Sequence, residues 1–144
     1  MKFMTLEEAW KLILQNEKLE YYRRDLSFMD KGTEEVAEYY KDKSGFHFYG
    51  EPNKYVLAFR ELDAHTCLVT ELYVVPEERM KGRSFELFDK IFKMFDDHDF
   101  IVNVNSRNNI GAIAYYKNGF RYVKDVDIRN GFVIRQYKKE RGRT

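Results

Sequence analysis

The sequence has little of two features that define large classes of proteins, cysteine and long apolar runs. Its 144 residues contain one cysteine, so a fold held by internal disulfides is excluded. The apolar neighbours of Cys67 predict a buried thiol that packs as a small hydrophobic group. No stretch approaches the roughly 20 apolar residues that cross a membrane as a helix. Acidic residues appear by Glu7, before any apolar run long enough for a signal peptide, so we expect a cytoplasmic protein.

The sequence also lacks an excess of charge of either sign. Lys and Arg number 25 and Asp and Glu number 24, which leaves a net charge of +1. This balance argues against a dedicated surface for an extended nucleic acid, although a few local cations can still bind one small phosphate group. Hydrophobic residues make up 44% and aromatic residues 17% of the chain, which is typical of a folded globular protein. The length predicts a single domain over residues 1–144 that needs no metal or disulfide to fold.

Sequence periodicity predicts helices at the start of the chain. Thr5 and Glu8 form a capping box, which predicts a helix from this point. Weaker patterns predict helices over residues 18–28 and 33–40. The expected inner face of the first helix consists of Leu6, Ala9, Trp10, Ile13 and Leu14.

The rest of the chain alternates between strand and helix patterns. Strands are expected at residues 46–48, 55–59, 65–75, 100–105, 120–127 and 132–137. Asn130-Gly131 is a strong hairpin signal between the last two strands. One helix is expected over 85–95, with Phe85, Phe88, Ile91, Phe92 and Phe95 facing inward, and another over 108–117. The basic segment 138–144 is expected to fray. This order predicts one α/β (α+β) domain with a largely antiparallel central sheet flanked by helices.

Two segments suggest chemistry. After the strand that ends at Pro76, the loop Arg79-Met80-Lys81-Gly82-Arg83-Ser84 leads into a helix. Free backbone N–H groups at a helix N-terminus favour a phosphate or pyrophosphate. An ordinary loop with solvated charges remains the alternative interpretation.

The second segment runs from Asn108 to Phe120. Gly111, Ala112 and Ala114 make one helix surface small, which lets a ligand approach closely. Tyr115 is a candidate proton donor, because a phenol can protonate a thiolate leaving group. A packed aromatic side chain is the alternative.

Together these segments resemble the GNAT superfamily of N-acetyltransferases, which use acetyl-coenzyme A. The strand end 71–76 (Glu-Leu-Tyr-Val-Val-Pro) and loop 79–84 resemble the cofactor motif R/Q-x-x-G-x-G/A, with Ser84 as a departure from it. The family pattern N-x-x-A-x-x-x-Y-x-x-x-G-F matches Asn108, Tyr115 and Gly119-Phe120 in register, with Gly111 in place of alanine. The resemblance covers residues 71 to about 122 well and the N-terminal third only in its number of helices.

The resemblance implies acetyl-CoA as the acyl donor and no metal. Backbone N–H groups of residues 81–84 would hold the pyrophosphate, and the pantetheine arm would lie in a splay between strands 65–75 and 100–105. A backbone N–H near Val74 would polarise the thioester carbonyl. The expected cofactor contacts are Leu72, Val74, Arg79, Met80, Lys81, Gly82, Arg83, Ser84, Asn108 and Tyr115.

The same resemblance implies an enzyme that acetylates a primary amine, on a small molecule or a protein, by direct attack in a ternary complex. Tyr115 would protonate the departing thiolate. Glu71 would act as the base, directly or through water, or would be only a structural strand carboxylate. A catalytically inactive CoA-sensing or protein-interaction module is the alternative function. Many family members pair as homodimers, and the sequence leaves the oligomeric state open.

A metal site is not expected. The run from Asp96 to Asp99 places adjacent side chains in different directions, and His47, His65 and His98 show no spacing typical of metal ligands. A solvated loop explains the acidic run better.

Overall fold

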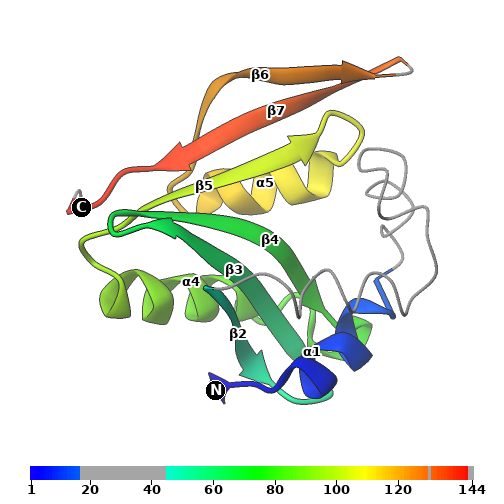
Figure 1. Ribbon diagram of the computed structural model, residues 1–144. Coiled ribbons are helices and arrows are strands. Elements are labelled where there is room, and N and C mark those ends of the chain that lie inside the picture. The colour runs from blue at the N-terminus through cyan, green and yellow to red at the C-terminus, as the bar shows by residue number, and fades with distance from the viewer. Residues whose placement is uncertain (17–44, 130, 143–144) are drawn as a thin grey trace.

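The computed structural model describes residues 1–16, 45–129 and 131–142 (Figure 1). The helices predicted over 18–28 and 33–40 lie outside these residues. The described elements are β1 (Lys2–Phe3), α1 (Leu6–Ile13), β2 (Phe46–Glu51), β3 (Tyr55–Asp63), β4 (Thr66–Val74), the 3-10 helix η2 (Pro76–Glu78), α4 (Arg83–Met94), β5 (Asp99–Asn105), α5 (Asn109–Lys117), β6 (Arg121–Arg129) and β7 (Phe132–Lys139).

The strands form one mixed sheet in the order β1-β2-β3-β4-β5-β7-β6. Among the described strands, only β4 and β5 pair in parallel, and every other neighbouring pair is antiparallel. The predicted fold class, a largely antiparallel sheet flanked by helices, is therefore confirmed. The two-residue connection from β6 to β7 also follows the Asn130-Gly131 signal.

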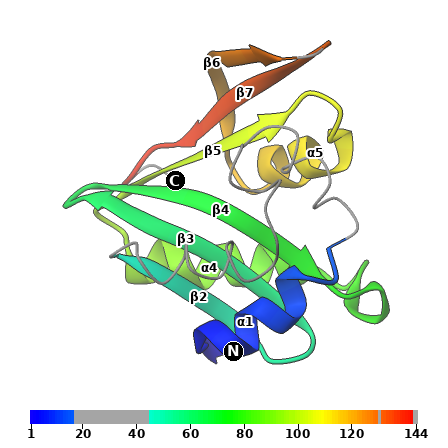
Figure 2. The same cartoon turned by 45° about the vertical axis from the view of Figure 1, so that its right-hand side comes forward.

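Helices cover both faces of the sheet. Helix α1 packs on one face (Figure 2), over Phe48, Val56, Ala58 and Tyr73. Helices α4 and α5 contribute to the core on the opposite face. That core consists mainly of Leu57, Phe59, Cys67, Val69, Leu87, Phe88, Ile91, Phe100, Val102, Tyr115 and Phe120. Cys67 is fully buried, as the sequence predicts.

A β-bulge in β4 switches the faces of this strand. Ala58 pairs with Glu71 and Phe59 with Val69, so Thr70 is an extra residue in β4. Before the bulge, Val69 packs in the core under α4, whereas after it Tyr73 packs in the core under α1. A bulge bends its strand and increases the local twist, and this one comes just where β4 leaves its neighbour β5.

The two central strands diverge. Pairing between β4 and β5 extends only from Thr66–Asp99 to Val69–Val102. Beyond this point β4 continues along β3 as far as Val74, while β5 stays paired with β7 as far as Asn105. In both views the strands meet at one end and separate toward the other (Figures 1 and 2). The sheet therefore opens at the carboxyl end of β4.

Two predicted helix faces differ from the structure. Phe85 was expected in the core but is 62% exposed, because the buried face of α4 is centred on Leu87, Phe88 and Ile91 and Phe85 lies at its edge. In α1 the predicted residues Ala9 and Ile13 are buried, but so is Leu12, whereas Leu14 forms the C-cap and is exposed. Apolar side chains near helix ends fit a helical period without being covered.

The two ends of the described residues have more strand structure than the sequence predicts. The sequence pattern gave no indication of β1, a short strand that pairs with β2. The predicted frayed tail at 138–144 is wrong for its first residues, because Lys138 and Lys139 complete β7 and the Arg141 N–H donates to Asp99 Oδ1 at 2.7 Å.

In the described part of the chain no helix is long and apolar enough to cross a bilayer.

The capping box generates a stability prediction. The Glu8 N–H donates to Thr5 Oγ1 at 3.2 Å, and the Thr5 N–H donates to Glu8 Oε1 at 3.0 Å. Thr5→Ala removes one of these acceptors and should lower the free energy of unfolding by about 1 kcal/mol. Urea denaturation measures the change. Thr5→Ser keeps the hydroxyl and should cost clearly less; equal costs for both variants would contradict the cap's contribution.

Candidate functional site

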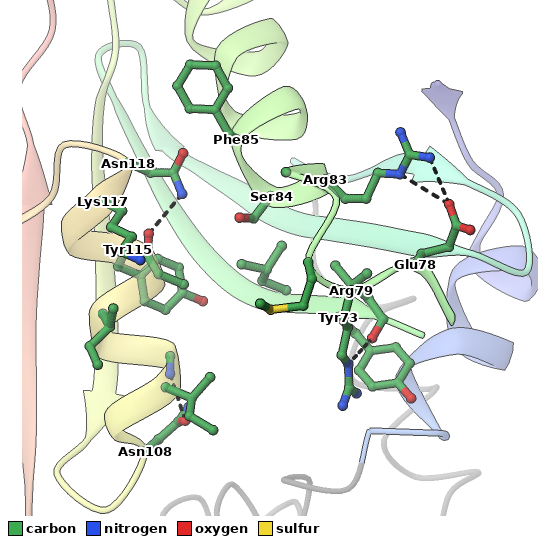
Figure 3. Close-up of a pocket in the computed structure, with 18 of the residues that line it drawn as sticks. Tyr73, Glu78, Arg79, Arg83, Ser84, Phe85, Asn108, Tyr115, Lys117 and Asn118 are labelled. Carbon is green, nitrogen blue, oxygen red and sulfur yellow. Dashed lines mark hydrogen bonds and ion pairs between the residues drawn. The ribbon is translucent and has the colours of Figure 1, made fainter. Parts of the chain in front are cut away.

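A cavity of about 650 Å³ opens where β4 and β5 separate, which is within the size range of small-molecule sites (Figure 3). Its walls come from the end of β4, the loop between β4 and α4, the first turn of α4 and one side of α5. The lining includes Leu72, Tyr73, Val74, Glu78, Arg79, Met80, Gly82, Arg83, Ser84, Phe85, Asn108, Ile110, Gly111, Ile113, Tyr115 and Lys117. A groove thus runs along the open edge of β4 toward a helix N-terminus.

The loop at the end of this groove has an unusual backbone. Met80 and Gly82 adopt the left-handed conformation, with φ of 66° and 74°. For Met80 this conformation costs about 1–2 kcal/mol, and such strain is concentrated at functional sites. Gly82 is the N-cap of α4 and has no side chain to cover the first backbone N–H groups of the helix. These N–H groups and the helix dipole make the loop suitable for an anion.

The basic residues of the loop are not all directed at the cavity. Lys81 does not line it, and Lys81 Nζ lies 3.3 Å from Glu78 Oε2. Arg83 donates from Nε to Glu78 Oε1 at 3.1 Å. Figure 3 shows this pair on the side of the loop away from α5. The sequence placed both cations on the loop but gave no sign that Glu78 would engage them.

Arg79 and the backbone of Val74 lie next to each other in the lining of the cavity. Arg79 Nε donates to the Val74 carbonyl at 2.8 Å, and its guanidinium lies 5.7 Å from the ring centroid of Tyr73. The Val75 N–H donates toward β3, to the Lys54 carbonyl at 2.9 Å. Because N–H groups alternate along a strand, the Val74 N–H is directed to the opposite edge, where β5 has separated.

Helix α5 forms the other wall. Asn108 is its N-cap and accepts a hydrogen bond from the Gly111 N–H at 3.0 Å. The Asn108 side chain folds over Gly111, and a Cβ at residue 111 would lie 2.9 Å from Asn108 Cγ. Glycine at this position, where the GNAT pattern has alanine, is therefore matched to the cap.

Tyr115 projects from α5 into the cavity and is otherwise buried (Figure 3). Burial raises its pKa well above the usual value of a phenol, and the charge of Glu71 adds to this effect. The hydroxyl therefore keeps its proton at any physiological pH and can donate it.

Glu71 is a buried carboxyl group, with 2% of its surface exposed. Burial raises its pKa to about 8, although hydrogen bonds from Asn16 and from the backbone of Leu72 act in the opposite direction. Asn16 Nδ2 donates to Glu71 Oε1 at 2.5 Å, and Asn16 lines the cavity whereas Glu71 does not. The carboxyl group thus lies next to the cavity and reaches it only by way of a neighbour or a water molecule.

The structure brings most of the predicted residues together. Nine of the ten expected cofactor contacts line one cavity, and Lys81 is the exception. Sequence reasoning missed eight further lining residues, which are Asn16, Tyr73, Glu78, Phe85, Ile110, Ile113, Lys117 and Asn118. The apolar members are exposed in the structure, Phe85 to 62%, Ile110 to 70% and Ile113 to 55%, and the helical period gave no sign of this, since it placed Phe85 in the core.

The raised pKa of Glu71 predicts a pH-dependent stability. The folded state holds a proton that the unfolded chain releases near pH 4.5, so the contribution of Glu71 to stability is full below pH 4.5 and declines as pH rises toward about 8. Glu71→Gln lacks this decline. Its melting temperature relative to wild type should therefore rise by roughly 10 °C between pH 5 and pH 8.5. Glu77→Gln, at an exposed carboxylate, is the control; an equal difference at both pH values for Glu71→Gln would contradict the prediction.

The chain matches no known family model and no curated protein sequence. Its fold, however, is found in many solved structures. An assigned acetyltransferase of Salmonella typhimurium, solved with its cofactor acetyl-CoA, has a TM-score of 0.66 at 16% identity and covers 96% of this chain and 91% of its own. A Desulfovibrio desulfuricans protein assigned to the GNAT family has a TM-score of 0.69 at 13% identity, covering 94% and 91%.

A third structure was solved with two ligands. Spermidine N-acetyltransferase from Vibrio cholerae, in complex with CoA and spermine, has a TM-score of 0.63 at 16% identity and covers 92% of this chain and 88% of its own. Identities this low carry information about the fold and not about the substrate. The chain therefore has the fold of the GNAT acetyltransferases.

Proposed function

We propose that the protein is an N-acetyltransferase that transfers the acetyl group of acetyl-CoA to a primary amine by direct attack in a ternary complex. One observation carries the proposal. The open edge of β4 leads through a single cavity from a buried tyrosine to an N-terminal helix turn that suits an anion. An extended molecule with a thioester at one end and a pyrophosphate at the other matches this arrangement.

The donor would bind in three parts. Its pyrophosphate would accept hydrogen bonds from the backbone at Gly82–Ser84, where the first turn of α4 has free N–H groups. Its pantetheine arm would lie along β4 in the place of a neighbouring strand, near Asn108. The exposed apolar side chains of Met80 and Ile110 at the cavity would then be covered, which would recover hydrophobic free energy that the empty site lacks.

The reaction needs no further reactant. The nitrogen of the neutral amine attacks the thioester carbon, and the carbonyl oxygen becomes an oxyanion that accepts a hydrogen bond from the Val74 N–H. The carbon–sulfur bond then breaks. The sulfur takes a proton from Tyr115, the nitrogen loses one, and the products are an acetylated amine and free coenzyme A.

Tyr115 is suited to the role of acid. Its hydroxyl points into the cavity and is protonated at neutral pH. Position is what fits it to the role, because burial raises its pKa and so makes it a weaker acid than a free phenol. A proton given to the thiolate would be replaced from the amine through the base or solvent, so Tyr115 ends each cycle in its starting state.

Glu71 would take the proton of the amine through a water molecule, because its carboxyl group does not itself line the cavity. With a pKa of about 8 the group is mostly protonated at neutral pH and becomes a better base as pH rises. An amine that arrives as its ammonium ion would lower the pKa of Glu71, because an adjacent positive charge favours the carboxylate. The acceptor class is therefore the primary amines, which are cationic in solution at neutral pH. Polyamines, amino-acid amines and peptide amines all remain within this class.

The function is tested by measuring coenzyme A release from acetyl-CoA with a thiol-reactive dye, over a panel of polyamines, amino-acid amines and peptides. Cys67 is buried and its pKa is raised to about 12, so it should contribute little background. Amine-dependent release, with one acetyl mass gained by the acceptor, is the expected result. Stabilisation by coenzyme A without any transfer would favour a CoA-sensing module. A ligand at 100 times its dissociation constant adds about 2.7 kcal/mol, so no thermal shift at millimolar cofactor would contradict both functions.

Tyr115→Phe tests the acid. Removing the hydroxyl should lower kcat by about 100-fold, because general acid catalysis contributes on this scale. The dissociation constant for coenzyme A, measured by calorimetry, should stay within about twofold, since the ring is retained. Tyr116→Phe is the matched control, because Tyr116 is 57% exposed and does not line the cavity. Unchanged turnover in Tyr115→Phe would exclude the proposed role.

A further inference from the structure

The carboxylate of Glu78 uses both of its oxygens on basic groups of the β4–α4 loop. Arg83 approaches Oε1 with Nε at 3.1 Å and Nη2 at 3.0 Å, and Lys81 Nζ lies 3.3 Å from Oε2. The Glu78 side chain is only 14% exposed, so water screens these contacts less than at an open surface. Burial opposes ionisation of Glu78, but the hydrogen bonds from Lys81 and Arg83 outweigh it, and the net pKa is lowered. Glu78 is therefore charged at neutral pH.

Arg83 is also held from other directions. Its Nη1 lies 3.2 Å from Glu86 Oε1, and its guanidinium carbon lies 5.6 Å from the ring centroid of Tyr55. These contacts keep the guanidinium on the side of the loop away from α5 (Figure 3). The side chain is thus neutralised by two carboxylates and packed on an aromatic ring before any ligand arrives.

The ion pairs lie at the anion end of the cavity. Glu78, Gly82, Arg83 and Ser84 all line it, and α4 begins at Arg83. The 3-10 helix η2 ends at Glu78 and fixes its backbone. A phosphate bound to the first N–H groups of α4 would therefore share one cavity with the Glu78 carboxylate, and two basic side chains of the loop, Lys81 and Arg83, would already have a partner. The phosphate and the Glu78 carboxylate are both negatively charged, so they repel each other.

We propose that Glu78 is an internal counter-ion that competes with the phosphate groups of the acyl donor for Lys81 and Arg83, and so limits the affinity of the site for the donor. The inference rests on the proposed function, because it takes the donor to be a coenzyme A thioester. Its consequence is that backbone N–H groups, more than the two basic side chains, hold the pyrophosphate in the native protein. Weak retention of the donor also favours release of the product, which carries the same phosphates.

The test compares the dissociation constant of coenzyme A for wild type and Glu78→Gln by calorimetry. Glutamine keeps the size and hydrogen-bonding oxygen of the side chain but removes its charge. Because it releases Lys81 and Arg83 for the ligand, Glu78→Gln should bind coenzyme A at least about fivefold more tightly, the scale of one moderate ion pair. The dependence of binding on salt should also become steeper, since two further cations then meet the phosphates.

Glu77→Gln is the matched control. Glu77 precedes Glu78 in η2 and is exposed, so its replacement removes the same charge from the same helix without touching the two ion pairs. Its effect on affinity should stay below about twofold, because solvent screens an exposed charge. Adding Arg83→Met to Glu78→Gln should abolish most of the gain, since the released guanidinium would be absent.

The outcomes separate the two proposals. Binding by Glu78→Gln that is no tighter than by Glu77→Gln, or weaker than by wild type, would overturn the role of Glu78 while leaving the proposed function intact. Thermal melting without ligand establishes that each variant is folded. Failure of coenzyme A to bind wild type and every variant would contradict the proposed function instead.

Discussion

The short parallel contact between β4 and β5 is the constraint on which the site depends. Each strand has a strong partner on its other side, β3 for β4 and β7 for β5, so the sheet survives although the two strands pair only as far as Val69 and Val102. The bulge at Thr70 turns β4 just beyond this point. The cavity beside the Val74 backbone exists because the pairing of β4 with β5 stops.

Two glutamates near the cavity have pKa values shifted in opposite directions, because their surroundings differ. Glu71 follows the bulge on β4 and is buried beside Asn16, so desolvation raises its pKa to about 8. Glu78 lies on η2 between two cations, so its pKa is lowered. In the proposed reaction the first carboxyl group can exchange a proton with an amine, whereas the second remains charged and acts only through its field. Environment, and not residue type, separates these roles.

Much of the fold could be predicted because its signals are local. The capping box at Thr5, the hairpin at Asn130-Gly131 and the runs of strand-forming residues in β3 and β4 each act over a few residues. The failures also have a physical basis. Phe85 satisfies the helical period yet lies beyond the area that the sheet can cover, and Lys138 belongs to β7 because pairing with β5 continues past the apolar residues.

For the site, the sequence by itself determined which chemical groups are present: a glycine at the start of α4, an asparagine cap and a tyrosine on α5, and a carboxyl group near the end of β4. The position of each group follows from the spacing of residues within one helix or strand. Only the tertiary structure decided which groups meet. It placed Asn16, which follows α1, on Glu71, brought Lys117 to the same cavity as Ser84, and turned Lys81 and Arg83 toward Glu78. Contacts of this kind depend on where β4 bends and on which direction each side chain takes, and neither property is encoded in a local pattern.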